Sequence, residues 1–243
     1  MSKPITLYSH GSCAKKGVPS FGIFTDILSL SATGPNPWKV AIILEELNIP
    51  YTHKFIKMAD MKKAPFEALN PNGRVPAIED PNTGITLWES GAIIEYLVQT
   101  YDTKAALTYT SSPERFYVSQ WLHFQMSGQG PYFGQAVWFS KFHEERIPSA
   151  TKRYLDHIKR VLYVLDKALE GKQWLVGDKC TIADLSFVTW DMMLPFIFGD
   201  DLGSLELEKN YPNYFAWNKR LMERPAVKKI AKEKTEAAAT HEQ

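Results

Sequence analysis

The first hundred residues alternate between two patterns of apolar positions. Four short runs have the length typical of β-strands, at residues 5–9, 51–57, 75–78 and 85–88. Between the first two, apolar residues recur with the i, i+3, i+4, i+7 spacing of one helix face, at Val40, Ile43, Leu44 and Leu47. A second helix follows the last strand, marked by Ile93, Ile94 and Leu97. The order β-α-β and then ββ-α predicts an α/β domain over residues 1–104.

Strand patterns stop after a polar, Thr- and Ser-rich linker at residues 102–113. Residues 116–142 form an aromatic helical region that we expect the Gly128, Gly130 and Pro131 positions to interrupt. A later helix carries a continuous apolar stripe, formed by Tyr154, Ile158, Val161, Leu165 and Leu169. The pattern predicts an all-α domain over residues 113–243.

Composition narrows the class of protein. A chain of 243 residues with 44% hydrophobic and 23% charged residues allows one or two globular domains. The net charge of +1 is far from the strongly basic charge that is typical of a nucleic-acid-binding protein. Cys13 and Cys180 have neither a disulfide framework nor metal-ligand spacing. The longest apolar stretch, residues 21–30, contains Asp26 and is too short to span a bilayer. We therefore predict a cytoplasmic protein without metal, membrane or nucleic-acid partner.

The residues from Asn70 to Pro76 predict a turn that leads into a strand with a proline near its start. Asn70 to Gly73 are turn formers, and Val75 opens the next apolar run. Pro76 lacks a backbone donor, which makes a central strand position unfavourable. A proline there leaves the backbone groups of Val75 for pairing with an extended peptide.

Glu89 and Ser90 lie between a predicted strand and a predicted helix. Ser90 is a favourable N-cap, and the helix N-terminus behind it favours a carboxylate. Glu89 can bind an ammonium group. One corner that holds both groups would recognise a free amino acid end. The alternative is that Val75 and Pro76 form only a turn and that Ser90 is only a cap.

These motifs resemble the glutathione-binding half of the glutathione transferases. The resemblance implies that Val75-Pro76 pairs with the cysteinyl backbone of glutathione and that Glu89-Ser90 holds its γ-glutamyl end. Residues 174–186, with Thr181 and Asp184 at capping-box spacing, resemble the family's helical-core capping motif. The family fold implied is a thioredoxin-like N-terminal domain followed by an all-α domain, in a homodimer.

The residues before the first helix suggest how a thiol would be activated. Pro37 suits the first helical position, which places Asn36 at the N-cap. An amide there can donate to a thiolate while the helix dipole stabilises the charge. The segment resembles the fungal nitrogen-regulation branch, named for a yeast prion protein and related to the bacterial nu class, in which asparagine replaces tyrosine, serine or cysteine. The resemblance assigns this role to Asn36; the alternative is a helix cap alone.

Other residues compete for parts of this site. Tyr8 and Ser9 end the first strand and carry hydroxyl groups, and Cys13 would suggest a thiol-exchanging enzyme. We expect Tyr8 to be a core residue and Cys13 to be too far from the helix. Lys62 or Lys63 is expected to pair with the glycyl carboxylate of glutathione, with Lys63 preferred.

An insertion at about residues 11–34 separates the first strand from the helix of Asn36. Removing residues 12–33 would leave an uninterrupted family pattern. Three interpretations remain open: a hydrophobic lid over the substrate, a surface loop, and a translated intron.

The aromatic region of the second domain corresponds to the family's electrophile pocket, and Tyr132 and Phe133 are expected to face it. The function implied is glutathione transfer to hydrophobic electrophiles, with peroxidase or disulfide reductase activity as variants, in detoxification. The alternatives are a non-enzymatic regulator of nitrogen metabolism that binds a transcription factor, as the yeast relative does, and a ligand carrier. We expect no prion behaviour, because no Asn/Gln-rich extension is present.

Overall fold

The computed structural model describes residues 2–10 and 34–240. Residues 11–33 of the predicted insertion, with Cys13, therefore lie outside the described part. The chain divides into two compact units, one formed by residues 1–104 with 225–243 and the other by residues 105–224.

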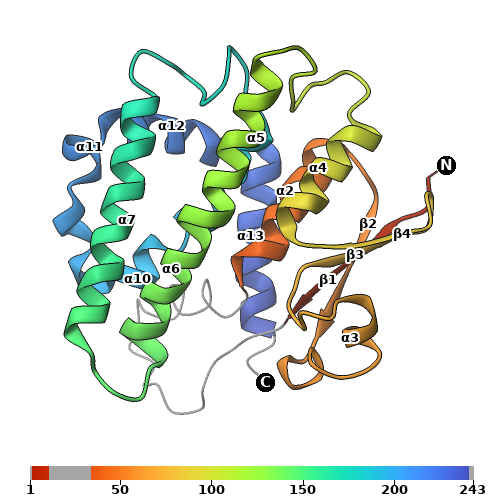
Figure 1. Cartoon of the computed structure of the whole chain (residues 1–243), viewed down its shortest axis with the longest axis horizontal. Helices are drawn as coiled ribbons and strands as arrows, with labels where there is room; N and C mark the ends of the chain where they lie inside the picture. Colours follow the sequence, from red (N-terminus) through yellow and green to blue (C-terminus); the bar gives the residue numbers. More distant parts are fainter. Residues whose placement is uncertain (1, 11–33, 241–243) are drawn as a thin grey trace. The chain divides into compact units, whose positions relative to one another are not determined.

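The first unit contains a four-stranded sheet in the order β2-β1-β3-β4 (Figure 1). β1 (Ile5–His10) pairs in parallel with β2 (Tyr51–Ile56) and antiparallel with β3 (Ala77–Asp80). β3 pairs antiparallel with β4 (Ile85–Trp88). This is the thioredoxin-like arrangement that the family resemblance implied, and it has the order of strands and helices that the apolar pattern predicted.

The helices of this unit complete its core. α2 (Pro35–Glu46) packs beside α4 (Ser90–Tyr101), as Figure 1 shows, and most of α2 is buried. The shorter elements η2 (Met58–Asp60) and α3 (Phe66–Leu69) connect β2 to the turn before β3.

The last helix, α13 (Pro225–Thr240), belongs to the first unit rather than to the predicted all-α domain over residues 113–243. It packs on α2, and the ammonium of Lys229 lies 2.5 Å from a carboxylate oxygen of Glu45. Val227 and Ile230 are fully buried. An amphipathic pattern shows that a helix has an apolar face, but it does not specify the partner of that face.

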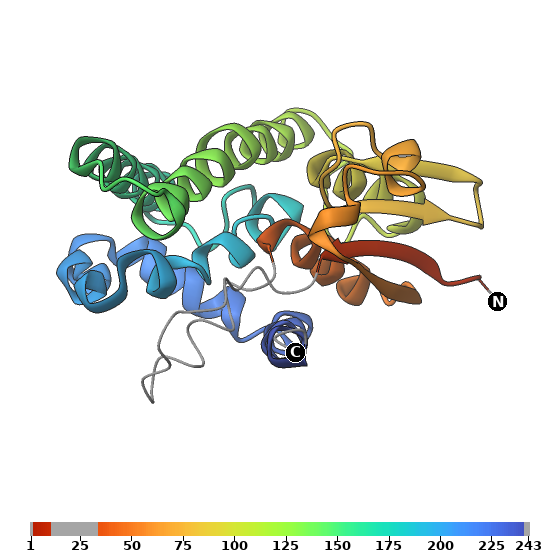
Figure 2. The ribbon, with the colours of Figure 1, turned by 90° about the horizontal axis from the view of Figure 1, so that it is seen from below.

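The second unit is entirely helical among its described residues. A helical run from α5 (Glu114–Phe124) through η3 (Gln125–Gln129) and α6 (Gly130–Val137) to η4 (Trp138–Phe142) continues without a break. Figure 2 shows this run in green. The predicted interruption at Gly128 to Pro131 is therefore wrong. Gly128 lies in a π-helical segment, η3, and Gly130 and Pro131 are the first two residues of α6 directly after it.

The rest of the second unit surrounds a buried core. α7 (Pro148–Ala168) carries the predicted apolar stripe. The following elements are α8 (Ile182–Leu185), α9 (Val188–Asp191), α10 (Leu194–Phe198), η5 (Gly199–Leu205), α11 (Leu207–Asn210) and α12 (Pro212–Met222). Residues 182–205 are apolar enough to cross a membrane, with a mean hydropathy of 1.3, but 83% of the segment is buried. Such burial is typical of a core segment.

The predicted capping box is present at the start of α8. Thr181 Oγ1 accepts from the backbone N–H of Ala183, and Asp184 accepts from that of Thr181. The other oxygen of Asp184 accepts from the Leu175 backbone and the Trp217 indole, each at 2.9 Å. Asp184 has no exposed surface, so its carboxylate joins three segments inside the unit.

Candidate functional site

The sheet register brings the two predicted halves of the site to the same end of the sheet. Ala77 pairs with Tyr8 on β1 and with Trp88 on β4. Pro76 comes directly before Ala77, and Glu89 comes directly after Trp88. Because antiparallel partners lie opposite each other, Pro76 and Glu89 flank one paired position. The end of β1 lies beside them.

The turn that leads to Pro76 is held by Asn70, which is 2% exposed. The Asn70 amide donates to the Arg74 carbonyl at 2.6 Å, and its oxygen accepts from the Asn72 backbone at 2.9 Å. Gly73 has a φ of 61°, which glycine adopts without strain. The peptide bond between Val75 and Pro76 is cis. The loop before β3 therefore has a defined conformation in which Val75 is partly exposed.

Glu89 has an unusual backbone conformation at the start of α4. Its φ is 70° and its ψ is 115°, and it occupies the N-cap position. Ser90, predicted as the N-cap, is instead the first helical residue. The correction follows from this conformation, because Glu89 already turns the chain before the helix begins. A positive φ at a glutamate is rare and costs about 1–3 kcal/mol, and such residues cluster at functional sites. Glu89 is exposed, whereas Ser90 is 4% exposed.

The N-terminus of α2 also differs from the prediction by one residue. Gly34 is the N-cap and Pro35 begins the helix, so Asn36 is the second helical residue. Proline suits the first helical position because its missing N–H would have no helical partner there, and Pro35 takes that position instead of Pro37. Asn36 is therefore not the N-cap, although it still lies in the first turn, where the helix dipole is felt.

His10 joins the end of β1 to this helix. The backbone N–H of Gly34 donates to the His10 Nε2 atom at 3.2 Å. This bond places the N-cap of α2 at the end of β1, and thus at the sheet end that carries Pro76. The sequence prediction missed His10, since nothing in its pattern links it to Gly34, 24 residues away.

Lys39 joins the first turns of α2 and α4. Its ammonium group donates to the Ser90 hydroxyl oxygen at 3.3 Å, although the residue is only 1% exposed. Burial lowers the pKa of Lys39 to about 7, while the charge of Glu89 acts in the opposite direction. A lysine inside an otherwise apolar helix is a signal that the sequence did contain, and the sequence prediction did not use it.

The hydroxyl groups at the end of β1 already have other partners. The Tyr8 hydroxyl donates to Glu79, and burial followed by this bond raises the pKa of Tyr8 to about 12. The Ser9 hydroxyl lies 2.5 Å from His53 Nε2, and burial lowers the pKa of His53 to about 4. Both Tyr8 and Ser9 are buried, at 5% and 1% exposure. Tyr8 is thus a core residue, as predicted.

The two lysines proposed for the glycyl end lie in different surroundings. The ammonium of Lys63 lies 3.3 Å from an oxygen of Asp60, and both side chains are largely exposed. Lys62 lies against the turn before Val75, because its Cγ is 2.9 Å from the position that a Cβ atom at Gly73 would occupy. Of the two, Lys62 is therefore the one that contacts this turn.

The two residues predicted to line an electrophile pocket lie on different faces of α6. Tyr132 stacks on His157 of α7, with ring centroids 3.5 Å apart. Phe133 has no exposed surface and packs edge-to-face with Trp190. Phe133 is therefore a core residue, which corrects its expected place in a cleft, because adjacent residues of a helix point in different directions.

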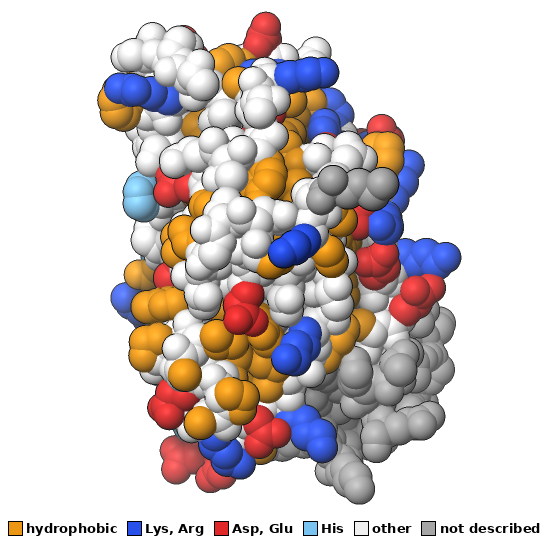
Figure 3. Space-filling model, turned by 90° about the vertical axis from the view of Figure 1, so that its right-hand side faces the viewer, with side chains coloured by type: hydrophobic (Ala, Val, Ile, Leu, Met, Phe, Trp, Pro, Cys, Tyr) orange, Lys and Arg blue, Asp and Glu red, His pale blue; other side chains and the backbone are white. Residues whose placement is uncertain are grey.

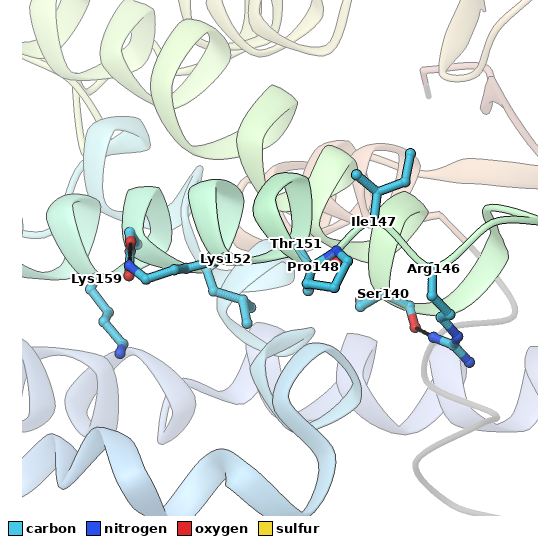
Figure 4. Close-up of a pocket in the computed structure, with 9 residues that line it drawn as sticks. Ser140, Arg146, Ile147, Pro148, Thr151, Lys152 and Lys159 are labelled. Carbon is cyan, nitrogen blue, oxygen red and sulfur yellow. Dashed lines mark hydrogen bonds and ion pairs between the residues drawn. The ribbon is translucent and has the colours of Figure 1, made fainter.

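A cavity of about 550 Å³ lies in the second unit near the start of α7. Its polar lining includes Arg146, which donates to the Ser140 carbonyl at 2.8 Å, and Lys152. Figure 4 shows Arg146 and Lys159 at opposite ends of this groove. The basic groups do not converge on one point, so the cavity lacks the arrangement expected of an anion-binding site. All of its lining residues belong to the second unit, so it is separate from the site in the first unit.

The described residues contain no cluster of His, Cys, Asp or Glu side chains suited to a metal ion. Figure 3 shows basic and acidic side chains interspersed on the face that it draws. The site in the first unit instead consists of two helix N-termini, one exposed carboxylate and one partly exposed backbone segment. Such a set of groups is suited to an organic ligand that carries an ammonium and a carboxylate.

A thioredoxin-like unit followed by an all-α unit is the architecture of the glutathione S-transferase fold. The family model for the glutathione S-transferase N-terminal domain matches residues 33–100, and that for the C-terminal domain matches residues 131–225. The chain belongs to the glutathione S-transferase family and is an enzyme of this class.

Two fungal proteins are among its relatives. Glutathione S-transferase 2 of Schizosaccharomyces pombe is 45% identical over 222 residues, or 86% of this chain and 96% of that protein. Protein URE2 of Candida albicans is 36% identical over 235 residues, or 81% of this chain and 67% of that protein. These two relatives place the chain in the fungal Ure2-like branch.

A solved structure of the same branch is also similar. Ure2p5 from Phanerochaete chrysosporium, cocrystallised with 1-(S-glutathionyl)-2,4-dinitrobenzene, superposes with a TM-score of 0.81 and is 36% identical. The superposition covers 98% of both chains.

Proposed function

We propose that this protein conjugates glutathione to hydrophobic electrophiles, with the glutathione bound at the sheet end formed by Pro76, Glu89 and the first turns of α2 and α4. One observation carries the proposal. Glu89 adopts a strained backbone conformation that leaves its carboxylate exposed at the N-terminus of α4, directly across the sheet end from Pro76. Strain of this kind persists where function requires it.

Each part of glutathione has a complementary group at this sheet end. Glu89 binds the α-ammonium of the γ-glutamyl residue, and Ser90 with the N-terminus of α4 binds its α-carboxylate. The backbone of Val75 pairs with the cysteinyl residue, with Pro76 holding the turn. Lys63 or Lys62 pairs with the glycyl carboxylate, and the contact of Lys62 with the turn favours Lys62.

Asn36 activates the thiol of the bound glutathione. Its position in the first turn of α2 places it within the field of the helix N-terminus, which stabilises a thiolate. The amide supplies a donor to the sulfur. The hydroxyl groups of Tyr8 and Ser9 bond to Glu79 and His53, which argues against either hydroxyl as the donor to the thiolate.

The electrophile is a hydrophobic small molecule or a peroxide, and detoxification is the corresponding role. The cocrystallisation of Ure2p5 with a glutathione conjugate of an aromatic compound supports an electrophile of this kind. Tyr132 remains our proposed contact on the second unit. We further propose that the protein acts in the cytoplasm as a homodimer, which light scattering at micromolar concentration tests. A monomer there would contradict the dimer.

A turnover assay tests the proposed activity. The full-length protein is supplied with glutathione and, in separate reactions, a halodinitrobenzene, a hydroperoxide and a mixed disulfide. We expect conjugation of the aromatic electrophile to be faster than the reaction without protein, and much slower in the Asn36→Ala variant. Tight glutathione binding with none of the three reactions would contradict the transferase proposal and leave a carrier or regulator.

The regulatory alternative is favoured by one finding, the similarity to Protein URE2 of Candida albicans. A regulator of this kind would bind a transcription factor without turning over glutathione. Co-purification of a GATA-type factor by both the native protein and a variant inactive in transfer would support it.

A further inference from the structure

The Lys39 side chain is a buried cation that the activity described so far does not use. It lies in α2, where most residues are apolar and buried, and it is 1% exposed. A buried ammonium group is costly unless it is paired, and in a sequence of this kind an apolar residue would pack there at lower cost. A lysine at this position therefore depends on polar and charged neighbours, of which Ser90 and Glu89 are two.

The contact of Lys39 with Ser90 constrains how the serine hydroxyl is oriented. An ammonium group can only donate hydrogen bonds, so the Ser90 oxygen is the acceptor in the 3.3 Å contact. The hydroxyl proton then points away from Lys39. The Ser90 hydroxyl can therefore donate only to a group other than Lys39.

The position of Ser90 determines which ligand group its hydroxyl can donate to. Ser90 is the first residue of α4, so its hydroxyl and the N-terminal N–H groups of the helix lie together. Helix N-termini favour carboxylates, and a buried positive charge behind the serine adds to the same field. Glu89, next along the chain, supplies the opposite charge for an ammonium. This corner thus has a positive charge at Lys39 and a negative charge at Glu89.

We propose that Lys39 is a positioning residue of the amino acid corner, holding the Ser90 hydroxyl as a donor to the α-carboxylate of the bound γ-glutamyl group and adding a positive charge behind it. This inference rests on the proposed function, since it assigns the ligand's carboxylate to Ser90. The lysine contributes to binding of the carboxylate and not of the ammonium.

The charge of Lys39 changes within the neutral range, because burial lowers its pKa to about 7. Of the charged groups on the elements packed against α2, Glu89 on α4 acts on Lys39 and favours its protonated form. The other titratable groups on the packed elements are Tyr8 and His10 on β1, Glu95, Tyr96 and Tyr101 on α4, and Lys228, Lys229, Lys232, Glu233, Lys234 and Glu236 on α13. Carboxylate binding should therefore weaken as the pH rises above about 7.

The test compares three ligands by titration calorimetry with the full-length protein. S-methylglutathione carries both groups of the γ-glutamyl end. Its glutaryl analogue lacks the α-ammonium, and its 4-aminobutyryl analogue lacks the α-carboxylate. The S-methyl group removes thiol chemistry from all three. The variants are Lys39→Met and Lys39→Gln, with Lys54→Met as the matched control, because Lys54 is an exposed lysine on β2 of the same unit.

We expect both Lys39 variants to lose about tenfold or more in affinity for S-methylglutathione and for the glutaryl analogue. Affinity for the 4-aminobutyryl analogue should change by less than about twofold, and Lys54→Met should leave all three unchanged. An equal loss for all three ligands would assign Lys39 a merely structural role and overturn the inference. Unchanged affinities in both variants would overturn it as well.

The native protein supplies an independent measurement should both variants fail to fold. Between pH 6 and 8.5 its affinity for the glutaryl analogue should fall by about tenfold or more, since Lys39 loses its proton over that range, whereas affinity for the 4-aminobutyryl analogue should stay nearly constant. Parallel pH profiles for the two analogues would overturn the inference. Failure of the native protein to bind S-methylglutathione at all would instead reject the proposed function, and this inference with it.

Discussion

The N-termini of α8 and α4 both carry an acidic residue, but the two carboxylates have different surroundings. At α8, Asp184 has no exposed surface and accepts from Thr181, Leu175 and Trp217. At α4, Glu89 is exposed, and among the described residues its side chain makes no capping hydrogen bond. Its backbone is also strained, whereas that of Thr181 at the start of α8 is extended.

We propose that this difference separates a residue that stabilises the fold, Asp184, from one that binds a ligand, Glu89. A carboxylate whose partners are all protein groups contributes to folding and has no capacity left for a substrate. The strained backbone of Glu89 costs free energy, and strain of this kind clusters at functional sites, which supports the proposed ligand contact. Both motifs were visible in the sequence, and only their burial distinguishes the two roles.

The largest effect is expected from Asp184→Ala. The substitution leaves four buried donor groups, on Leu175, Thr181 and Trp217, without their acceptor, and each costs about 1–3 kcal/mol. The free energy of unfolding should fall by at least about 3 kcal/mol, measured by chemical denaturation. Asp178→Ala is the control: its carboxylate is exposed and accepts from the Tyr109 hydroxyl, so its loss should lower the stability much less. Equal stability of the two variants would mean that the buried carboxylate of Asp184 stabilises the fold no more than an exposed carboxylate does. The contrast drawn between α8 and α4 would then be wrong.

Substitution of the α4 pair should reduce ligand binding while the fold survives. Glu89→Ala or Ser90→Ala removes a hydrogen bond to a charged group, worth about 1.5–3 kcal/mol, so glutathione affinity should fall roughly tenfold or more. Calorimetry gives the affinity, and Glu95→Ala in the same helix is the control. Unchanged affinity in both variants would refute the assignment of the γ-glutamyl end.

Asn36 should act on the rate and on the thiol pKa. In Asn36→Ala the pKa of bound glutathione should rise by roughly one unit, because a hydrogen bond to a thiolate is lost. Asn36→Asp keeps a residue that is favourable in the first turn of a helix, by about 0.3–1 kcal/mol, yet it repels the thiolate, so conjugation should slow. Thiolate absorbance against pH and the conjugation rate measure the two effects. Full activity in Asn36→Asp would place the activator elsewhere, while Tyr8→Phe should leave the rate unchanged.

The strain at Glu89 can be measured separately from its charge. Glu89→Gly and Glu89→Ala both remove the carboxylate, but only glycine adopts a positive φ without strain. Glu89→Gly should therefore be more stable than Glu89→Ala by about 1 kcal/mol, while both bind glutathione weakly. Thermal unfolding measures the difference in stability between the two variants. A glycine variant less stable than the alanine variant would mean that the backbone at this position is not strained.

The smallest effect concerns the two lysines before the turn. Both are exposed, so a pair with the glycyl carboxylate contributes about 0.2–1 kcal/mol. Lys62→Ala should weaken glutathione binding more than Lys63→Ala, since Lys62 lies against the turn that carries Val75. Retained affinity in the double alanine variant would exclude both residues.

Much of the fold could be predicted because local patterns determine local structure. Period-two and period-3.6 spacing located the four strands, α2, α4 and α7. The capping box at Thr181 was also predictable, since its two members are three residues apart. The start of α2 was less certain, because Pro35 and Pro37 both suit a first helical position and only one can occupy it.

The sequence by itself determined the family motifs, the order of elements and the chemistry available at Asn36, Glu89 and Ser90. Only the tertiary structure decided that α13 packs on α2, that Phe133 is buried, and that Lys39 reaches Ser90, 51 residues away. The physical reason is that hydrophobic burial is non-directional: an apolar pattern shows that a face will be buried, but not against which partner. A polar contact between distant residues depends on that choice of partner, so it becomes visible only after the chain has folded.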